Sequence, residues 1–479
     1  MVHASWHKSL LELSQLLGTL VVLLFVLALP HKARADVASW IVVDAQNGSV
    51  LEQYQSTRQW YPASLTKMMT AYVLFRMIEG GQMTLESPIT ISENAHKLPP
   101  SKMGFKPGTQ VTAHNALMMI MVKSANDVAM AIGESVAGSE AAFVKLMNQE
   151  AQRLGMYQTN FVNAHGLPDD RQVSSARDMA ILSLALWNDF PQYRAYLNKP
   201  GIRFGNVTMK SGIREYLLRV PGASGIKTGY ICNSGYNVSL AATRRGRSVI
   251  AVILGSASAM ERSAFARQLI ETGFDRRQGP HVSSLNTAGA LPPPEPDYCK
   301  RNEKPDAQQL VDRFGEKRQG AGMLAYANTE QPAPEGISVY KSNNKIDWTL
   351  VYNQILGPRL HTYEPYRVVA GLPQSAVAAT SPLGAQVPLP KPKPIISSAP
   401  AIAPSDIPIP PRKQSYLSHP QPFQPVAGNA RSASLLFSNE LKGAVQLVDR
   451  DAASAPLDSG FFGAPGGLYK SQSTQTQIN

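Results

Sequence analysis

The sequence predicts an α+β protein in which an antiparallel sheet packs against a block of helices. A β-rich run at residues 39–44 is followed by Asn47-Gly48, a strong hairpin signal because both residues tolerate positive φ. Several helical segments come next, and three strand-like runs and a final helix follow them. Strands on both sides of a helical block favour an antiparallel sheet with a helical subdomain.

The main elements follow from the apolar pattern. The longest apolar segment extends from Leu65 to Ile78 and stops at Gly80-Gly81, a good helix C-cap. Because this segment is hydrophobic on nearly every face, we expect a buried central helix. Further helices are expected at about 113–123, 127–137, 140–154, from Ser175 onward, and at about 260–273. Strands are expected at 225–230, 238–242 and 249–254, the last two as a hairpin around Arg245-Gly246.

Composition divides the chain into three parts. Residues 1–35 have the features of a cleavable signal peptide, with an apolar run from Leu16 to Leu29 before Ala33-Arg34-Ala35. An uncleaved anchor is the alternative, although the run is shorter than the ~20 residues that span a bilayer. Residues 36–280 have the composition of a packed domain. Because 25 of the 36 prolines lie after residue 280, we expect residues 281–479 to form a Pro-rich, mostly disordered extension, with a few short strands near 337–370.

Charge and cysteine content limit the partners. The net charge of +12 favours an anionic partner, but aromatic residues make up only 8% and do not alternate with basic ones, so we expect no nucleic-acid binding. Export would allow Cys232 and Cys299 to form a disulfide, and two free thiols fit the sequence as well. Neither cysteine lies in a metal-ligand spacing, and we expect no metal or other cofactor.

The first candidate site is Ser64-Leu65-Thr66-Lys67, at the start of the buried helix. Residues three apart on a helix share a face, so the hydroxyl and the amine can meet. A serine becomes a nucleophile when a base takes its proton, and a buried lysine with a lowered pKa can be that base. The spacing alone is weak, because Ser5-Lys8 and Ser342-Lys345 share it without a buried helix behind them.

Two further motifs complete the pattern. Ser124-Ala125-Asn126 falls between two helices and offers a hydroxyl and an amide for proton relay and substrate binding. Lys227-Thr228-Gly229 lies on an expected strand, where Lys227 and Thr228 could bind a carboxylate and Gly229 leaves room for an extended peptide. Each motif also occurs by chance, but their order and structural contexts are typical of penicillin-recognising serine enzymes.

The chain resembles the D-alanyl-D-alanine carboxypeptidases, the low-molecular-mass penicillin-binding proteins of serine peptidase family S11, over about residues 36–280. The matching segments are 61–70, 123–127, 163–168, 225–230 and 234–237. The resemblance implies a β-lactamase/transpeptidase-like fold. It also implies removal of the terminal D-alanine from peptidoglycan pentapeptides, covalent inhibition by β-lactams, and a periplasmic role in cell-wall biogenesis and cell shape.

The resemblance further implies roles for single residues. Ser64 would attack the peptide carbonyl with Lys67 as general base, and the backbone N–H groups of Ser64 and Tyr230 would form the oxyanion hole. The other expected roles are proton transfer by Ser124 and Lys227, substrate orientation by Asn126, carboxylate binding by Arg262 with Thr228, and a second arginine near the site, Arg214. Some relatives have histidine where Tyr230 stands. A C-terminal membrane-binding helix is not recognisable, so membrane association stays open.

Other functions fit parts of the pattern. A DD-endopeptidase that cleaves cross-links would use the same machinery. A class A β-lactamase needs a glutamate that activates the deacylating water, but the segment from Tyr157 to Arg177 contains Asp169 and Asp170 and no glutamate. A non-catalytic envelope-binding protein is disfavoured by the three intact motifs, although the basic, Pro-rich extension could bind anionic wall material.

Overall fold

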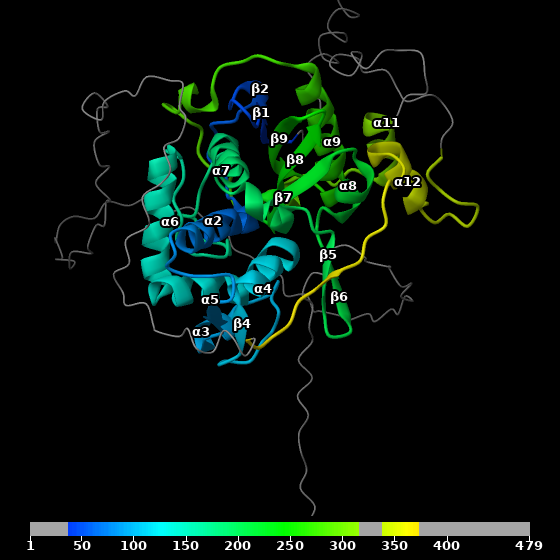
Figure 1. Cartoon of the computed structure of the whole chain (residues 1–479). Coiled ribbons are helices and arrows are strands. Elements are labelled where there is room, and N and C mark those ends of the chain that lie inside the picture. The colour runs from blue at the N-terminus through cyan, green and yellow to red at the C-terminus, as the bar shows by residue number, and fades with distance from the viewer. Residues whose placement is uncertain (1–36, 316–337, 373–479) are drawn as a thin grey trace, which may run out of the picture. The chain divides into compact units, whose positions relative to one another are not determined.

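The computed structural model describes residues 37–315 and 338–372, in which a central sheet has helices on both faces (Figure 1). The expected signal peptide and the remainder of the extension lie outside the described residues. Five antiparallel strands form the sheet in the order β2-β1-β9-β8-β7. They are β1 (Ser39–Asp44), β2 (Val50–Tyr54), β7 (Ala223–Ile231), β8 (Gly235–Arg244) and β9 (Arg247–Ser256). The α+β prediction with an antiparallel sheet is confirmed.

The two faces of the sheet are buried in separate apolar clusters. Because successive side chains of a strand point to opposite faces, alternate residues of β9 belong to different clusters. Ile250, Val252 and Leu254 pack with the helical block, and Val249, Ala251 and Ile253 pack on the other side. β7 forms one edge of the sheet and pairs only with β8.

The helical block covers one face of the sheet. Its central helix α2 is buried from Lys67 to Met77, as the unbroken apolar run predicts. The expected helix at 113–123 is shorter, because a single π turn, η2 (Met119–Lys123), follows α4. The helices of the block are α2 (Lys67–Glu79), α3 (Glu93–Lys97), α4 (Ala113–Met118), α5 (Asn126–Ala137), α6 (Glu140–Leu154) and α7 (Ala176–Asp189), with the 3₁₀ turns η1 (Ala63–Thr66) and η3 (Pro191–Leu197).

The opposite face is covered by α9 (Ala259–Asp275) and α8 (Arg214–Arg219), together with two helices from the region expected to be disordered. These are α11 (Ala307–Phe314) and α12 (Trp348–Leu356), which bury apolar residues such as Val311 and Ile355 against the sheet side. The high proline content averaged over residues 281–479 gave no indication of these short amphipathic segments. The part of the extension that the structure describes thus contains helices at Tyr298–Arg301, Ala307–Phe314 and Trp348–Leu356. The short strands expected near 337–370 are a helix, one isolated bridge and the two-residue β10 (Tyr366–Arg367).

Short strands that the sequence did not predict brace the helical block. β3 (Pro88–Thr90) pairs with β4 (Gln110–Thr112), and β5 (Gly201–Phe204) pairs with β6 (Val207–Lys210). Residues 357–372, which we call the C-terminal strap, run from α12 along β5, where β10 adds in parallel (Figure 1). The strap also donates hydrogen bonds from Leu360 N–H to Leu218 and from Gly371 N–H to Gln110.

The two cysteines form a disulfide. Cys232, in the turn after β7, forms a disulfide with Cys299 in α10 (Tyr298–Arg301), so neither is a free thiol. A 3₁₀ turn, η4 (Val282–Ser284), precedes α10 in the chain. Among the described helices, none combines the length and apolar character that crossing a bilayer requires.

Candidate active site

The turn that carries Ser64 is held in a strained backbone by two glycines. Ala63 has a φ of 48°, which is uncommon for a residue with a side chain. A Cβ on Gly166 would lie 2.0 Å from the Ala63 carbonyl oxygen, and a Cβ on Gly229 would lie 3.1 Å from the Ser64 nitrogen. Only glycines allow the loop and strand β7 to approach the turn so closely. Ser64 thus lies directly beside the edge strand.

Lys67 lies at the start of α2 with its amine in a fully buried position. Its Nζ donates to Ser64 Oγ at 3.1 Å, to Asn126 Oδ1 at 2.8 Å, and to the backbone carbonyl of His165. Burial, and then the positive charge of Lys227, lower the pKa of Lys67 well below 10.5, although Asp127 opposes this shift. An amine that loses its proton easily and touches a hydroxyl can act as a base.

His165, whose carbonyl accepts a hydrogen bond from Lys67 Nζ, is itself buried. The His165 Nδ1 accepts the Leu167 N–H at 3.2 Å, and Nε2 lies 3.3 Å from Glu140 Oε1. Because Nδ1 accepts a hydrogen bond, the neutral ring carries its proton on Nε2, on the side of Glu140. Burial, and then the charge of Lys67, lower the pKa of His165 to about 3, so the ring is uncharged near neutral pH.

Ser124 follows the π turn η2 and has a left-handed backbone, with φ of 64°. Such conformations in a residue with a side chain concentrate at functional sites. Two residues later, Asn126 Nδ2 donates to the Pro99 carbonyl at 2.9 Å, so its Oδ1 faces Lys67. Asp127 accepts the backbone N–H groups of Met103 and Gly104 and fixes the loop beside this motif.

Strand β7 brings the third motif opposite the second. Lys227 Nζ donates to Ser124 Oγ at 3.0 Å and to the Thr228 carbonyl at 3.0 Å. The side chain is buried, and burial followed by the charge of Arg262 lowers the pKa of Lys227 to about 7. Two buried amines, Lys67 and Lys227, therefore flank the position between Ser64 and Ser124.

The residues after the glycine are more open. Tyr230 is 42% exposed, and its ring packs on that of Tyr236 with centroids 4.3 Å apart and the planes tilted by 34°. Arg262 lies behind this pair and is buried. Its guanidinium donates to the carbonyl oxygens of Asn237 and Gly212, at 3.4 and 3.0 Å, and Nε has no hydrogen-bond partner among the described residues. Within that part of the chain it pairs with no carboxylate, so its charge is uncompensated beside Lys227.

Arg214 does not join this group in the described structure. It begins α8, where its guanidinium pairs with Glu215 at 2.6 Å and hydrogen-bonds Tyr363 of the C-terminal strap. No hydrogen bond links it to the other candidate side chains in the described ranges. Its place in the site therefore stays a prediction.

Sequence reasoning gave no role to several residues that support the site. Asn237 Nδ2 donates to the carbonyl oxygens of Tyr61 and Pro62, at 2.9 and 3.3 Å, and so holds the segment before Ser64 against β8. The other residues missed in this way are Asp127, Glu140 and His165. Asn237 binds the backbone carbonyls of Tyr61 and Pro62, and Lys67 binds the backbone carbonyl of His165. Contacts to a backbone carbonyl leave no pattern of side chains in the sequence. The segments 123–127, 163–168 and 234–237 that carry the resemblance include Asp127, His165 and Asn237, so the family pattern marked these positions without giving them a role.

The arrangement combines a nucleophile, a base and a buried cation. It suits acyl transfer, because one amine can take the proton of Ser64 while Ser124 and Lys227 can return a proton to a leaving group. Within residues 37–315 and 338–372, no cluster of His, Cys, Asp and Glu side chains is suited to hold a metal ion.

Comparison with known proteins gives the family. The family model described as D-alanyl-D-alanine carboxypeptidase matches residues 28–258. The D-alanyl-D-alanine carboxypeptidase of Streptomyces sp. (strain K15) is 30% identical over 229 residues, which cover 44% of this chain and 78% of that relative. The chain belongs to the D-alanyl-D-alanine carboxypeptidase family. The expected family is thus confirmed, and with it the β-lactamase/transpeptidase-like fold class.

Other members of the carboxypeptidase family match a longer part of this chain but a smaller share of their own length. DacA of Escherichia coli (strain K12) is 35% identical over 258 residues, and DacC of the same organism is 32% identical over 245 residues. The match covers 51% and 50% of this chain, but only 62% and 61% of these two relatives. The solved structure of penicillin binding protein 5 from Haemophilus influenzae is 31% identical, with a TM-score of 0.48 over 50% of this chain and 71% of that one.

Proposed function

We propose that this chain is an exported serine D-Ala-D-Ala carboxypeptidase that trims peptidoglycan pentapeptide stems in the periplasm. The 3.1 Å contact between Lys67 Nζ and Ser64 Oγ carries the proposal, because the amine is buried and its pKa is lowered. Membership of the carboxypeptidase family supports the reaction class.

The acylation step follows from the contacts of Ser64. Ser64 Oγ forms a bond to the carbonyl carbon between the two D-alanines while its proton moves to Lys67 Nζ. The negative oxygen of the tetrahedral intermediate accepts hydrogen bonds from the backbone N–H groups of Ser64 and Tyr230. The C–N bond then breaks, and the proton that Lys67 took up passes through Ser124 and Lys227 to the leaving amine, so that Lys67 is neutral again. D-alanine departs, and an ester on Ser64 remains.

Hydrolysis of the ester restores the enzyme. Water attacks the ester carbonyl and gives its proton to Lys67, and Ser64 leaves as a hydroxyl. The segment expected to carry an activating glutamate in a β-lactamase offers Asp169 instead. Arg171 holds the pKa of Asp169 at about 2 by hydrogen bonds at the surface. A β-lactam ester on Ser64 would therefore be hydrolysed slowly, which makes these drugs inhibitors.

Substrate binding uses the open edge of the sheet. An extended peptide can add to β7 through main-chain hydrogen bonds. The terminal carboxylate would then bind Thr228, with the buried charge of Arg262 behind it, and Asn126 would hold the substrate amide. A carboxylate placed there compensates the positive charge that no acidic side chain among the described residues balances.

The test uses the full chain and a muramyl pentapeptide. Wild type should release D-alanine and Ser64→Ala should release none, with mass spectrometry placing a penicillin adduct on Ser64. Ser342→Ala is a matched control, because Ser342 and Lys345 have the same spacing on an exposed segment; its rate should equal that of wild type. Equal release by Ser64→Ala would refute the mechanism. A cross-linked dimer peptide as second substrate separates carboxypeptidase from endopeptidase activity.

A further inference from the structure

The turn after β7 begins two residues beyond Tyr230 and is closed by its own hydrogen bonds. The Ser234 N–H donates to the Ile231 carbonyl at 3.0 Å, and the Ile231 N–H donates to Ser234 Oγ at 3.2 Å. Because β7 has a neighbouring strand on one side only, this turn largely determines where the last residues of the strand lie.

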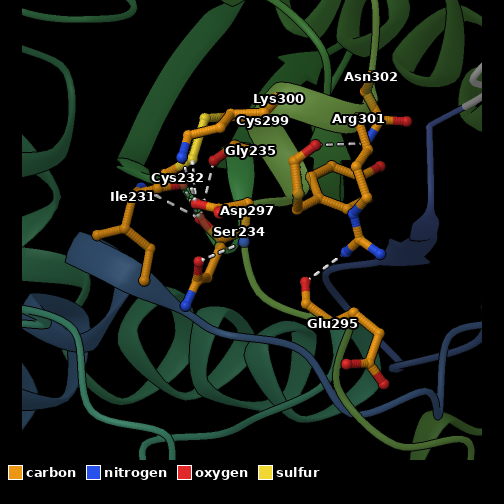
Figure 2. Close-up of a disulfide and its surroundings, with 12 residues drawn as sticks. Ile231, Cys232, Ser234, Gly235, Glu295, Asp297, Cys299, Lys300, Arg301 and Asn302 are labelled. Atoms are coloured by element: carbon orange, nitrogen blue, oxygen red, sulfur yellow. Dashed lines mark hydrogen bonds and ion pairs between the residues drawn. A yellow bond between two sulfur atoms is a disulfide. The ribbon is translucent and has the colours of Figure 1, made fainter. Parts of the chain in front are cut away.

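Residues 295–302, which we call the clamp, hold this turn from outside (Figure 2). The disulfide joins Cys232 to Cys299, with Cα atoms 4.8 Å apart. The Cys299 N–H donates to the Cys232 carbonyl at 2.9 Å, and the Asp297 N–H donates to Asn233 Oδ1 at 3.0 Å. Three links thus connect the clamp to two residues of the turn, across sequence separations of 64 and 67.

The clamp is also held together internally. Figure 2 shows that Arg301 reaches back to the carbonyl of Glu295, and the Asn302 amide donates to the Tyr298 carbonyl at 2.7 Å. The clamp can therefore act as one unit on the turn.

Tyr298 extends the clamp towards the nucleophile. Its hydroxyl donates to the Gly255 carbonyl at 2.8 Å, and its ring meets Trp60 edge-on, with centroids 5.1 Å apart. Trp60 is fully buried, and its Nε1–H donates to the Ser234 carbonyl at 2.9 Å. Trp60 precedes Ser64 by four residues. The clamp thus contacts both the turn after β7 and the segment that leads to Ser64.

We propose that the Cys232–Cys299 disulfide and Tyr298 form a positioning element that fixes the backbone N–H of Tyr230 relative to Ser64. The inference rests on the proposed function, in which these backbone groups bind the oxyanion. A misplacement of about 1 Å costs about 100-fold in rate. Loss of the disulfide or of Tyr298 releases only one end of the turn and should move β7 by less than about 1 Å. We therefore expect acylation to slow about tenfold.

The first experiment measures the second-order rate of acylation by a fluorescent penicillin. The double variant Cys232→Ala/Cys299→Ala and the single variant Tyr298→Ala should each react about tenfold more slowly than wild type. Hydrogen exchange of the amides of residues 229–235 should become faster in both variants. Glu271→Ala is the control, because it removes a bidentate pair with Arg244 (2.6 Å for each bond) at the opposite end of β8. It should lower the melting temperature and leave acylation unchanged.

Reduction of the folded wild type is a second test that requires no new folding. Dithiothreitol converts the bridge to two thiols and is itself oxidised to its cyclic disulfide. Acylation should slow about tenfold and recover after reoxidation. Unchanged acylation in both the double variant and the reduced protein would overturn the proposal, as would equal slowing in Glu271→Ala. If wild type is not acylated at all, the proposed function fails, and the exchange data alone decide whether the clamp holds the end of β7.

Discussion

Replacing Lys227 by methionine should make the protein more stable near neutral pH while abolishing acylation. Methionine has a similar length and carries no charge, so the change removes the buried cation without creating a large cavity. Burial, and then the charge of Arg262, lower the pKa of Lys227 from 10.5 to about 7. Because of this lowered pKa, the protonated form of Lys227 lowers the free energy of unfolding.

The sign and size follow from proton linkage. Above pH 10.5 the lysine is neutral in both states and costs nothing. As the pH falls, the unfolded chain takes up the proton first, so the folded state loses stability until the pH reaches about 7. With about 1.36 kcal/mol per pKa unit, the loss is about 4 kcal/mol at pH 7 and about 1 kcal/mol at pH 10.

The substitution also removes two hydrogen bonds, to Ser124 Oγ and to the Thr228 carbonyl. At about 1 kcal/mol each, their loss leaves Lys227→Met about 2 kcal/mol more stable than wild type at pH 7. The same variant should be about 1 kcal/mol less stable at pH 10.

Urea unfolding of both proteins between pH 6.5 and pH 10 measures this difference. The difference in unfolding free energy should change sign across the range, with a total change of about 3 kcal/mol. Lys67 is present in both proteins, and loss of the Lys227 charge raises the pKa of Lys67 in the folded variant, which shifts the difference in the same direction near pH 7. A difference that does not vary with pH, or a variant that is less stable at pH 7 than wild type, would refute the reasoning.

Three further changes test other parts of the structure. Gly229→Ala places a Cβ 2.8 Å from the Pro62 carbonyl, so penicillin acylation should slow at least about tenfold; an unchanged rate contradicts this. Burial and the charge of Lys67 lower the pKa of His165 to about 3, against 6.5 in the unfolded chain. The unfolded state therefore binds the proton first, and urea unfolding should show about 1.5 kcal/mol less stability at pH 5 than at pH 6.5 from this residue, a slope that His165→Asn removes. Arg219→Ala removes hydrogen bonds to Glu215, Asn353 and the Gly357 carbonyl, although Glu215 keeps its pairs with Arg214 and Arg359. At about 1 kcal/mol for each lost bond it should cost about 3 kcal/mol in the same assay; a loss below about 1 kcal/mol would contradict this.

The sequence predicted those parts of the protein that depend on local pattern. The buried helix, the long strands and the three motifs each occupy a continuous segment, so apolar periodicity and turn residues identify them. The motifs lie at a helix start, an interhelical loop and an edge strand. Lys67 therefore contacts Ser64 and Asn126, and Lys227 contacts Ser124.

Other features depend on contacts that leave no local trace. The carbonyl of His165 beside Lys67 is a backbone group, and any residue type could supply it. The pairing of Cys232 with Cys299 needs α9 to fold between them. The helix α12 was missed because proline content, averaged over a long window, concealed a short apolar face. Arg214 was placed by resemblance alone, and Glu215 and Tyr363 bind its guanidinium in the structure.

The C-terminal strap has a consequence for the order in which the protein is made. β10 pairs with β5, a strand that leaves the ribosome more than 150 residues earlier, and α12 covers apolar surface of α8 and α9. Until residue 372 is synthesised and delivered, that surface has no cover and β5 has an open edge, the kind of intermediate that aggregates. A chain cut at residue 280 would keep every catalytic group. It would still expose the apolar surface of α8 and α9 and the edge of β5, which chaperones and proteases recognise.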